Sequence, residues 1–129
     1  MATAAKIQAI VVDDQLTMRA LVRTSLQQIG IVNVREFPSA AEALHNVQLV
    51  PAHIIISDFN MPEMDGLEFL KKLRANPQMQ NTAFILLTGR ADKELVARAL
   101  QFGANNYLVK PFTTAVLKQK IEQVVGALT

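Results

Sequence analysis

Residues 53–62, with the sequence HIIISDFNMP, constrain the fold of this chain more than any other segment. The three consecutive isoleucines show no polar alternation, which is typical of a strand buried on both faces of a parallel sheet. The apolar run stops at Asp58, and Pro62 cannot donate a hydrogen bond to a neighbouring strand. We therefore predict that Asp58 stands at the carboxyl end of a buried central strand, where open α/β sheets bind their ligands. Taken alone, Asp58 is equally consistent with a cap of the following turn.

The rest of the chain repeats this pattern of an apolar strand followed by an amphipathic helix. Strands are expected at residues 6–12, 31–37, 53–58, 83–87 and 107–109. Helical spacing of apolar residues predicts helices that include residues 18–29, 39–47, 65–76, 92–102 and 114–128. This alternation predicts a parallel sheet with helices on both faces. The second and fifth strands are the least uniformly apolar, so the flavodoxin-like (βα)5 three-layer sandwich with strand order 2-1-3-4-5 fits best.

Composition excludes several classes of protein. The 129 residues are half apolar and 19% charged, which suits one compact domain over residues 1–129. The absence of cysteine excludes disulfides, thiolate metal sites and cysteine catalysis. No apolar run approaches the roughly 18 residues that span a bilayer, and the net charge of +2 comes without a basic stripe. We expect a cytoplasmic monomer that binds neither nucleic acid nor membrane.

Four of the five predicted strands end in a charged or hydroxyl side chain: Asp13 with Asp14, then Asp58, Thr88 and Lys110. The carboxyl ends of parallel strands lie on one edge, and neighbouring strands are about 4.8 Å apart, so these groups can converge on one pocket. Two unit charges about 4 Å apart interact by roughly 4 kcal/mol at an effective dielectric near 20. Three clustered carboxylates therefore repel by several kcal/mol, and Lys110 offsets only part of this repulsion.

A divalent cation would offset more of the repulsion, and a set of oxygen ligands favours Mg²⁺, Mn²⁺ or Ca²⁺. We expect direct ligation by Asp14 and Asp58, ligation through water by Asp13, and a further ligand from the backbone carbonyl of Asn60. Mg²⁺ bound in this way leaves room for phosphate oxygens. Thr88 and Lys110 would then hold phosphoryl oxygens, and Asp58 would be the nucleophile that forms an aspartyl phosphate.

Each of these residues also has a purely structural interpretation. Asp13 and Asp14 are also typical caps of the first helix, Thr88 is a common residue before a helix, and Lys110 is consistent with a solvated loop lysine. Tyr107 is more often an aromatic at the edge of a core than a switch. His45 and His53 have no second histidine at ligand spacing, so neither is expected to bind a metal.

Four segments together resemble the receiver domains of two-component response regulators. They are VVDDQLTMR at 11–19, IISDFNMPEMDG at 55–66, ILLTG at 85–89 and YLVKPF at 107–112. The resemblance covers nearly the whole chain, and single-domain CheY-like chemotaxis regulators are the most similar in architecture. Such a match implies phosphorylation of Asp58 by a histidine kinase, with Mg²⁺ held by Asp13, Asp14 and the Asn60 carbonyl.

The resemblance also implies a switch. Thr88 and Lys110 would contact the phosphoryl group, and Tyr107 would change rotamer as Thr88 moves. This would remodel the surface formed by the helix at 92–102, the strand at 107–109 and the helix at 114–128. In a chemotaxis pathway, a protein such as the flagellar motor switch would bind that surface. The Lys110–Pro111 peptide bond is expected to be cis, an isomer that costs little before proline.

Some functions stay open at the level of the sequence. The domain could serve as a phosphate sink or relay receiver, as a binding module without phosphorylation, or as an Mg²⁺-dependent phosphotransfer enzyme. Enzymes of the haloacid-dehalogenase type place a second aspartate where this chain has Asn60, so we expect an acceptor rather than a turnover enzyme. Arg90 occupies a position that is commonly acidic in CheY-like proteins and would alter the approach of a phosphatase. Gly89 would leave space for Tyr107 to turn inward.

Overall fold

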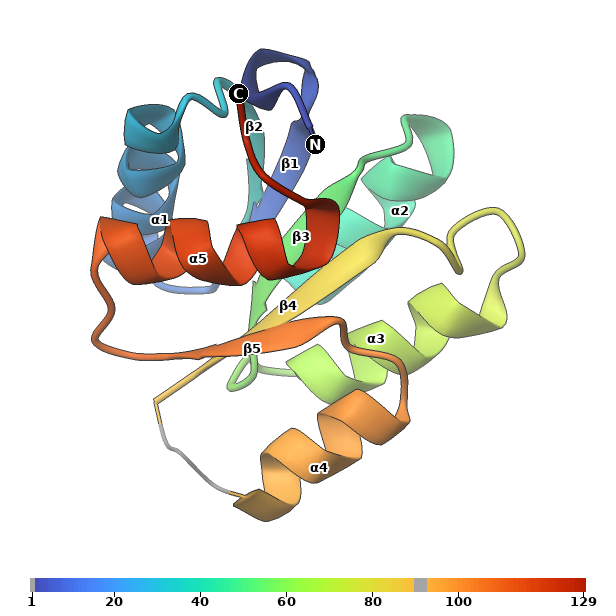
Figure 1. Cartoon of the computed structure of the whole chain (residues 1–129). Coiled ribbons are helices and arrows are strands. Elements are labelled where there is room, and N and C mark those ends of the chain that lie inside the picture. The colour runs from blue at the N-terminus through green and yellow to red at the C-terminus, as the bar shows by residue number, and fades with distance from the viewer. Residues whose placement is uncertain (1, 90–92) are drawn as a thin grey trace.

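The structure is a computed structural model that describes residues 2–89 and 93–129. One parallel sheet has the order β2-β1-β3-β4-β5, which confirms the predicted flavodoxin-like topology. The strands are β1 (Gln8–Val12), β2 (Asn33–Phe37), β3 (Ile54–Asp58), β4 (Ala83–Thr88) and β5 (Asn106–Val109). The helices are η1 (Ala4–Lys6, a 3₁₀ turn), α1 (Leu16–Ile29), α2 (Ala40–Leu49), α3 (Gly66–Ala75), α4 (Lys93–Gln101) and α5 (Thr114–Val125). Helices α1 and α5 cover one face of the sheet, and α2, α3 and α4 cover the other (Figure 1).

The central strands are apolar throughout because their alternate side chains enter two different cores. Ile55 of β3 packs in the core beneath α2 and α3, whereas Ile54 and Ile56 pack in the core beneath α1 and α5. All residues of β3 and β4 are buried. The edge strands β2 and β5 are only partly buried, which agrees with their less uniform sequences. The sheet is therefore supported from both sides, and its strand ends are fixed by packing.

Local sequence signals set most of the helix ends. Gly30 adopts a left-handed conformation with φ of 103° at the end of α1, which is typical of a C-terminal glycine cap. The hydroxyl of Ser39 accepts a hydrogen bond from the Glu42 N–H and so caps the start of α2. The predicted start of the fourth helix at residue 92 lies outside the described residues. No helix in the described part of the chain is long and apolar enough to cross a membrane.

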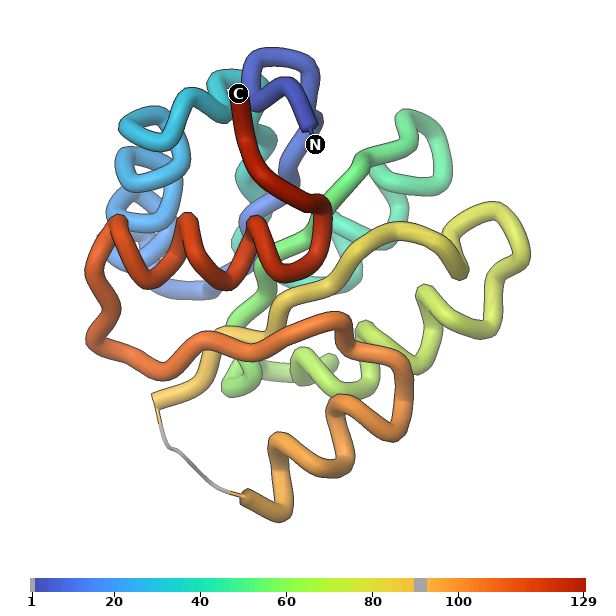
Figure 2. Tube along the Cα trace, in the orientation of Figure 1, coloured from blue at the N-terminus to red at the C-terminus, as the bar shows by residue number. Residues whose placement is uncertain are grey.

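Two predicted boundaries were wrong at the ends of the chain. The strand predicted at 6–12 begins at Gln8, because residues 4–6 form the 3₁₀ turn. The helix predicted to reach residue 128 ends at Val125, because Gly126 takes φ of 88° and Leu128 pairs with Ala2 in a β-bridge. The two ends of the chain consequently lie side by side (Figure 2).

Gly66, the first residue of α3, lies against the end of β3. A Cβ atom at this position would be 2.4 Å from the carbonyl oxygen of Asp58 and 3.0 Å from Cδ1 of Leu86. We predict that Gly66→Ala lowers the free energy of unfolding by at least about 1–3 kcal/mol, the usual cost of overpacking, since backbone must move to admit the methyl group. Urea unfolding of the two proteins measures this difference.

Gly89→Ala is the matched control for this substitution. A Cβ atom at Gly89 would meet nothing within 4 Å among the described residues. Its effect on stability should stay within about 0.5 kcal/mol, as for most surface substitutions. Equal stability of Gly66→Ala and Gly89→Ala would show that the close approach of α3 to β3 imposes no constraint.

Candidate functional site

The residues predicted to form a site gather at the carboxyl edge of the sheet. Asp58 ends β3, Thr88 ends β4, Asp13 follows β1 directly, and Lys110 follows β5. One carboxylate oxygen from each of Asp13, Asp14 and Asp58 lies within 4.8 Å of the other two. Asp13 and Asp58 are buried and Asp14 is exposed, so the acidic cluster is closed by protein on one side and open to solvent on the other.

Lys110 is the cation that faces this cluster. Its Nζ lies 2.8 Å from Oδ1 of Asp58 and 3.6 Å from Oδ2 of Asp13. The Lys110 N–H donates to the carbonyl of Thr88 at 2.8 Å, and the Lys110–Pro111 bond is cis, as expected. Lys110 is therefore tied to β4 and points into the site rather than into solvent. One ammonium nevertheless balances only part of the charge of three carboxylates.

Asp13 is held by its own backbone and by one of its carboxylate oxygens. Its N–H donates to the carbonyl of Phe37 at 3.2 Å, and its Oδ1 accepts a hydrogen bond from the Gln15 N–H at 2.9 Å. Its Oδ2 is buried and accepts no hydrogen bond from the described residues. Burial raises the pKa of Asp13 above its ordinary value of 3.8. The hydrogen bond from the Gln15 N–H lowers this pKa, whereas repulsion from Asp58 raises it further.

This geometry fits a hard divalent cation. Every side chain in the cluster offers oxygen, which is what Mg²⁺, Mn²⁺ and Ca²⁺ prefer. The buried Oδ2 of Asp13 lies 3.6 Å from Nζ of Lys110 but accepts no hydrogen bond from the described residues, and buried polar atoms of this kind normally have a hydrogen-bond partner. A cation at this point would supply the partner and relieve the repulsion. The exposed carboxylate of Asp14 would hold such a cation on the side of the cluster that is open to solvent.

The other predicted site residues lie around this cluster. The side chain of Thr88 is buried at the end of β4, and Asn60 is exposed in the loop after β3. Tyr107 is half-buried on β5, with Nζ of Lys120 4.4 Å from the centroid of its ring. Gly89 is exposed, whereas Arg90 lies outside the described residues. The ligand role of the Asn60 carbonyl and the switch role of Tyr107 stay predictions.

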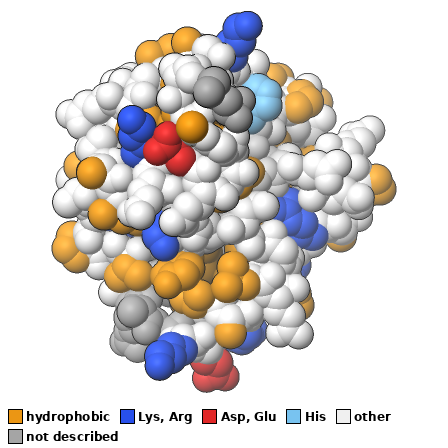
Figure 3. All heavy atoms as spheres, viewed as in Figure 1, with side chains coloured by type: hydrophobic (Ala, Val, Ile, Leu, Met, Phe, Trp, Pro, Cys, Tyr) orange, Lys and Arg blue, Asp and Glu red, His pale blue; other side chains and the backbone are white. Residues whose placement is uncertain are grey.

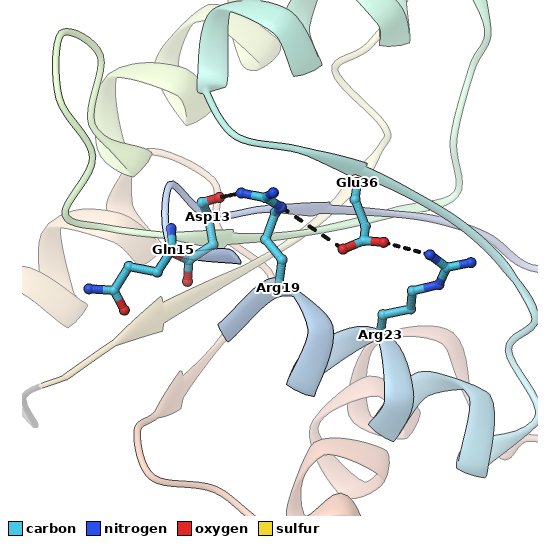
Figure 4. A network of polar contacts seen from close by, with 5 residues as sticks. All are labelled: Asp13, Gln15, Arg19, Arg23 and Glu36. Carbon is cyan, nitrogen blue, oxygen red and sulfur yellow. Dashed lines mark hydrogen bonds and ion pairs between the residues drawn. The ribbon is translucent and has the colours of Figure 1, made fainter. Parts of the chain in front are cut away.

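Sequence reasoning missed two residues next to the site. Arg19 of α1 donates a hydrogen bond to the carbonyl of Asp13, and Glu36 of β2 faces Arg19 (Figure 4). Arg19 belongs to the segment VVDDQLTMR, but nothing in its spacing indicates a contact with a carbonyl six residues earlier. Glu36 carries no signal in the sequence, because its contact depends on how α1 packs beside β2.

Comparison with known proteins gives consistent results. A family model described as the response regulator receiver domain matches residues 9–122. The chain is 45% identical to a probable chemotaxis protein CheY of Rhizobium etli over 99% of both chains. It is 41% identical to the chemotaxis protein CheY1 of Helicobacter pylori, over 91% of this chain and 95% of that protein. A solved structure of the Vibrio cholerae chemotaxis protein CheY4 has a TM-score of 0.85 and 34% identity, covering 92% of this chain and 98% of the other.

The raised pKa of Asp13 predicts how stability depends on pH without a metal. Folding raises the pKa of this carboxyl above its ordinary value of 3.8. The group therefore stabilises the native state fully at pH values below 3.8, and this contribution is lost as the pH rises through the raised pKa. We predict that Asp13→Asn, which is neutral at every pH, increases the free energy of unfolding at pH 7 in EDTA. The increase should shrink as the pH falls toward 3.8.

Urea unfolding in EDTA between pH 3.5 and pH 7 measures the effect. Glu68→Gln removes an exposed carboxylate on α3 and is the control, whose stability at pH 7 should stay within about 0.5 kcal/mol of the wild type, as for most surface substitutions. A lower stability of Asp13→Asn at pH 7 would show that burial of this carboxylate carries no cost.

Proposed function

The chain belongs to the response regulator receiver domain family, and we propose that it accepts a phosphoryl group on Asp58 from a histidine kinase in an Mg²⁺-dependent reaction. The observation that carries this proposal is the acidic cluster of Asp13, Asp14 and Asp58, in which one carboxylate oxygen of each residue lies within 4.8 Å of the other two. The Lys110 ammonium lies 2.8 Å from Asp58 in this cluster. Residues 1–129 would act as one receiver domain. Receiver domains are signalling modules, and this one would act as an acceptor rather than a turnover enzyme.

Asp13, Asp14, Asp58 and the Asn60 carbonyl would hold Mg²⁺. When bound, the ion would neutralise negative charge on the phosphoryl oxygens and on the carboxylates. Asp13 and Asp58 are buried at the strand ends, so little rearrangement of these two carboxylates would be needed. The exposed Asp14 would leave one side open for the phosphodonor.

Asp58 would be the nucleophile of the transfer step. A carboxylate oxygen of Asp58 would form a bond to the phosphorus of a phosphohistidine, and the nitrogen–phosphorus bond would break with its electron pair passing to the imidazole. Lys110 would exchange its ion pair with Asp58 for one with a phosphoryl oxygen, so its charge would stay partnered throughout. The hydroxyl of Thr88 would donate to another phosphoryl oxygen.

The added phosphoryl group would bring a charge of about −1.5 to −2 to the sheet edge. Thr88 and Lys110 would move toward it, and Tyr107 would respond because it lies on β5, the strand that leads to Lys110. The proposed output surface comprises α4, β5 and α5. Tyr107 borders a groove of about 360 Å³ on this surface, together with Lys93, Val96, Ala97 and Leu100 of α4.

The chemistry of this surface suits a protein partner. Apolar side chains gather over β5 and α4 and are bordered by Lys and Arg side chains (Figure 3). An amphipathic segment with acidic flanks would complement that arrangement. Because the relatives are chemotaxis proteins, a flagellar motor switch component is the partner we propose. Service as a phosphate sink or relay would require phosphorylation but no such partner. The cytoplasmic location and the monomeric state stay predictions.

Incubation with acetyl phosphate and Mg²⁺ tests the phosphoacceptor directly. We expect the wild-type protein to gain one phosphoryl group by intact-mass spectrometry, and hydroxylamine to remove it as expected for an acyl phosphate. Asp58→Asn should gain none, because its side chain amide is a poor nucleophile. EDTA should prevent labelling of the wild type. The control variant Glu68→Gln should be labelled as the wild type is, whereas equal labelling of Asp58→Asn would exclude Asp58 as the acceptor.

A further inference from the structure

Arg19 lies beside the acidic cluster but has no part in the transfer step. Its Nη1 donates a hydrogen bond of 2.7 Å to the carbonyl of Asp13, and its Nε lies 3.9 Å from Oε1 of Glu36 (Figure 4). The other carboxylate oxygen of Glu36 accepts a bond of 2.7 Å from Nη1 of Arg23. A chain of charged groups thus runs from the solvent-facing side of α1, through the edge strand β2, to the backbone of Asp13.

The carbonyl that accepts the hydrogen bond from Arg19 lies between two residues of the acidic cluster. The carbonyl of Asp13 belongs to the peptide group that joins Asp13 to Asp14, and both residues contribute to the acidic cluster. A bond to this carbonyl limits rotation of the peptide plane, so it affects the direction of both side chains. The bond from Nη1 is short and charge-assisted, which makes it stronger than a neutral hydrogen bond.

The remaining contacts of Asp13 complete this restraint. Its N–H donates to the carbonyl of Phe37, its Oδ1 accepts from the Gln15 N–H, and its carbonyl accepts from Arg19. Of the polar groups of Asp13, only Oδ2 accepts no hydrogen bond from the described residues, and that atom lies 3.6 Å from Nζ of Lys110. Every other polar group of Asp13 is used to fix the residue, and the one left over is directed into the site.

The burial of the Arg19 side chain explains why it needs the carboxylate of Glu36 beside it. The side chain of Arg19 is only 14% exposed and that of Glu36 22%, whereas that of Arg23 is 49% exposed. A buried guanidinium without a counter-charge would cost several kcal/mol. It would also repel a cation bound at the cluster. The carboxylate of Glu36, which Arg23 shares, offsets part of both effects and so lowers the cost of holding the Arg19 guanidinium against the Asp13 carbonyl.

We propose that Arg19, kept in place by Glu36, is a positioning residue that sets the Mg²⁺ affinity of the site through the Asp13–Asp14 peptide. This inference rests on the proposed function, because it assumes that the acidic cluster binds Mg²⁺. Residues that orient metal ligands commonly change metal affinity by about 10- to 100-fold when they are removed. Arg19 acts on the backbone of two ligands rather than on a ligand atom, so we expect the lower end of this range.

Isothermal titration calorimetry with Mg²⁺, at pH 7 and at a temperature where every variant is folded, tests the proposal. Arg19→Met keeps the length of the side chain but cannot donate a hydrogen bond, and we expect its dissociation constant to rise about 10-fold. Arg19→Lys keeps a charged donor and should recover most of the loss. Glu36→Gln should weaken binding in the same direction as Arg19→Met.

Arg23→Gln is the matched control, since Arg23 also contacts Glu36 from α1 but does not reach Asp13. Its dissociation constant for Mg²⁺ should stay within about twofold of the wild type, because it touches no ligand backbone. Thermal unfolding in EDTA accompanies each titration and reports on the fold without a metal.

The direction of the change separates positioning from other roles. Loss of a positive charge near the site would by itself tighten Mg²⁺ binding in Arg19→Met, and a purely structural role would lower the unfolding temperature without changing the dissociation constant. Either result would overturn the proposal. Weak binding by Arg19→Met together with normal binding by Arg23→Gln supports it. A wild-type protein that does not bind Mg²⁺ would instead overturn the proposed metal site and this inference with it.

Discussion

Repulsion among the carboxylates of Asp13, Asp14 and Asp58 is the interaction on which the rest of the structure depends. Their oxygens lie within 4.8 Å of one another at the edge of a sheet that is buried on both faces. Such a cluster costs several kcal/mol unless cations compensate it. Lys110 provides one positive charge at 2.8 Å from Asp58, and a bound divalent cation would offset more of the remaining charge. Under the proposed function, a charged phosphoryl group would bind to the same cations.

The fold keeps this unfavourable arrangement in place. Strands β1 and β3 lie between two apolar cores, one on each face of the sheet. Because Gly66 has no side chain, α3 can begin directly against the Asp58 carbonyl. The backbone of Asp13 is bonded to β2 and to α1. Asp13 and Asp58 are buried at or directly after the ends of β1 and β3, which limits how far these two carboxylates would move when the charge at Asp58 changes. The ion pair that Lys110 forms with Asp58 would change with it.

Sequence reasoning reached the fold because β1, β3 and β4 are apolar in uninterrupted runs, and because β2 and β5 are less so. The same reasoning brought Asp13, Asp58 and Lys110 together, since parallel strands end at one edge. It could not find the Arg19–Glu36 contact, which depends on the packing of α1 beside an edge strand. It also extended the last helix past Gly126, because the apolar spacing continues to Leu128 while the backbone turns to pair with Ala2.

A crystal structure grown with Mg²⁺ and beryllofluoride, a stable mimic of a phosphoryl group on a carboxylate, tests the central claim most directly. We expect the metal to be bound by Asp13, Asp14 and Asp58, with the beryllium bonded to a carboxylate oxygen of Asp58. Lys110 and Thr88 should contact its fluorine atoms. Metal bound elsewhere, or an unmodified Asp58 still paired with Lys110 at saturating beryllofluoride, would contradict the account.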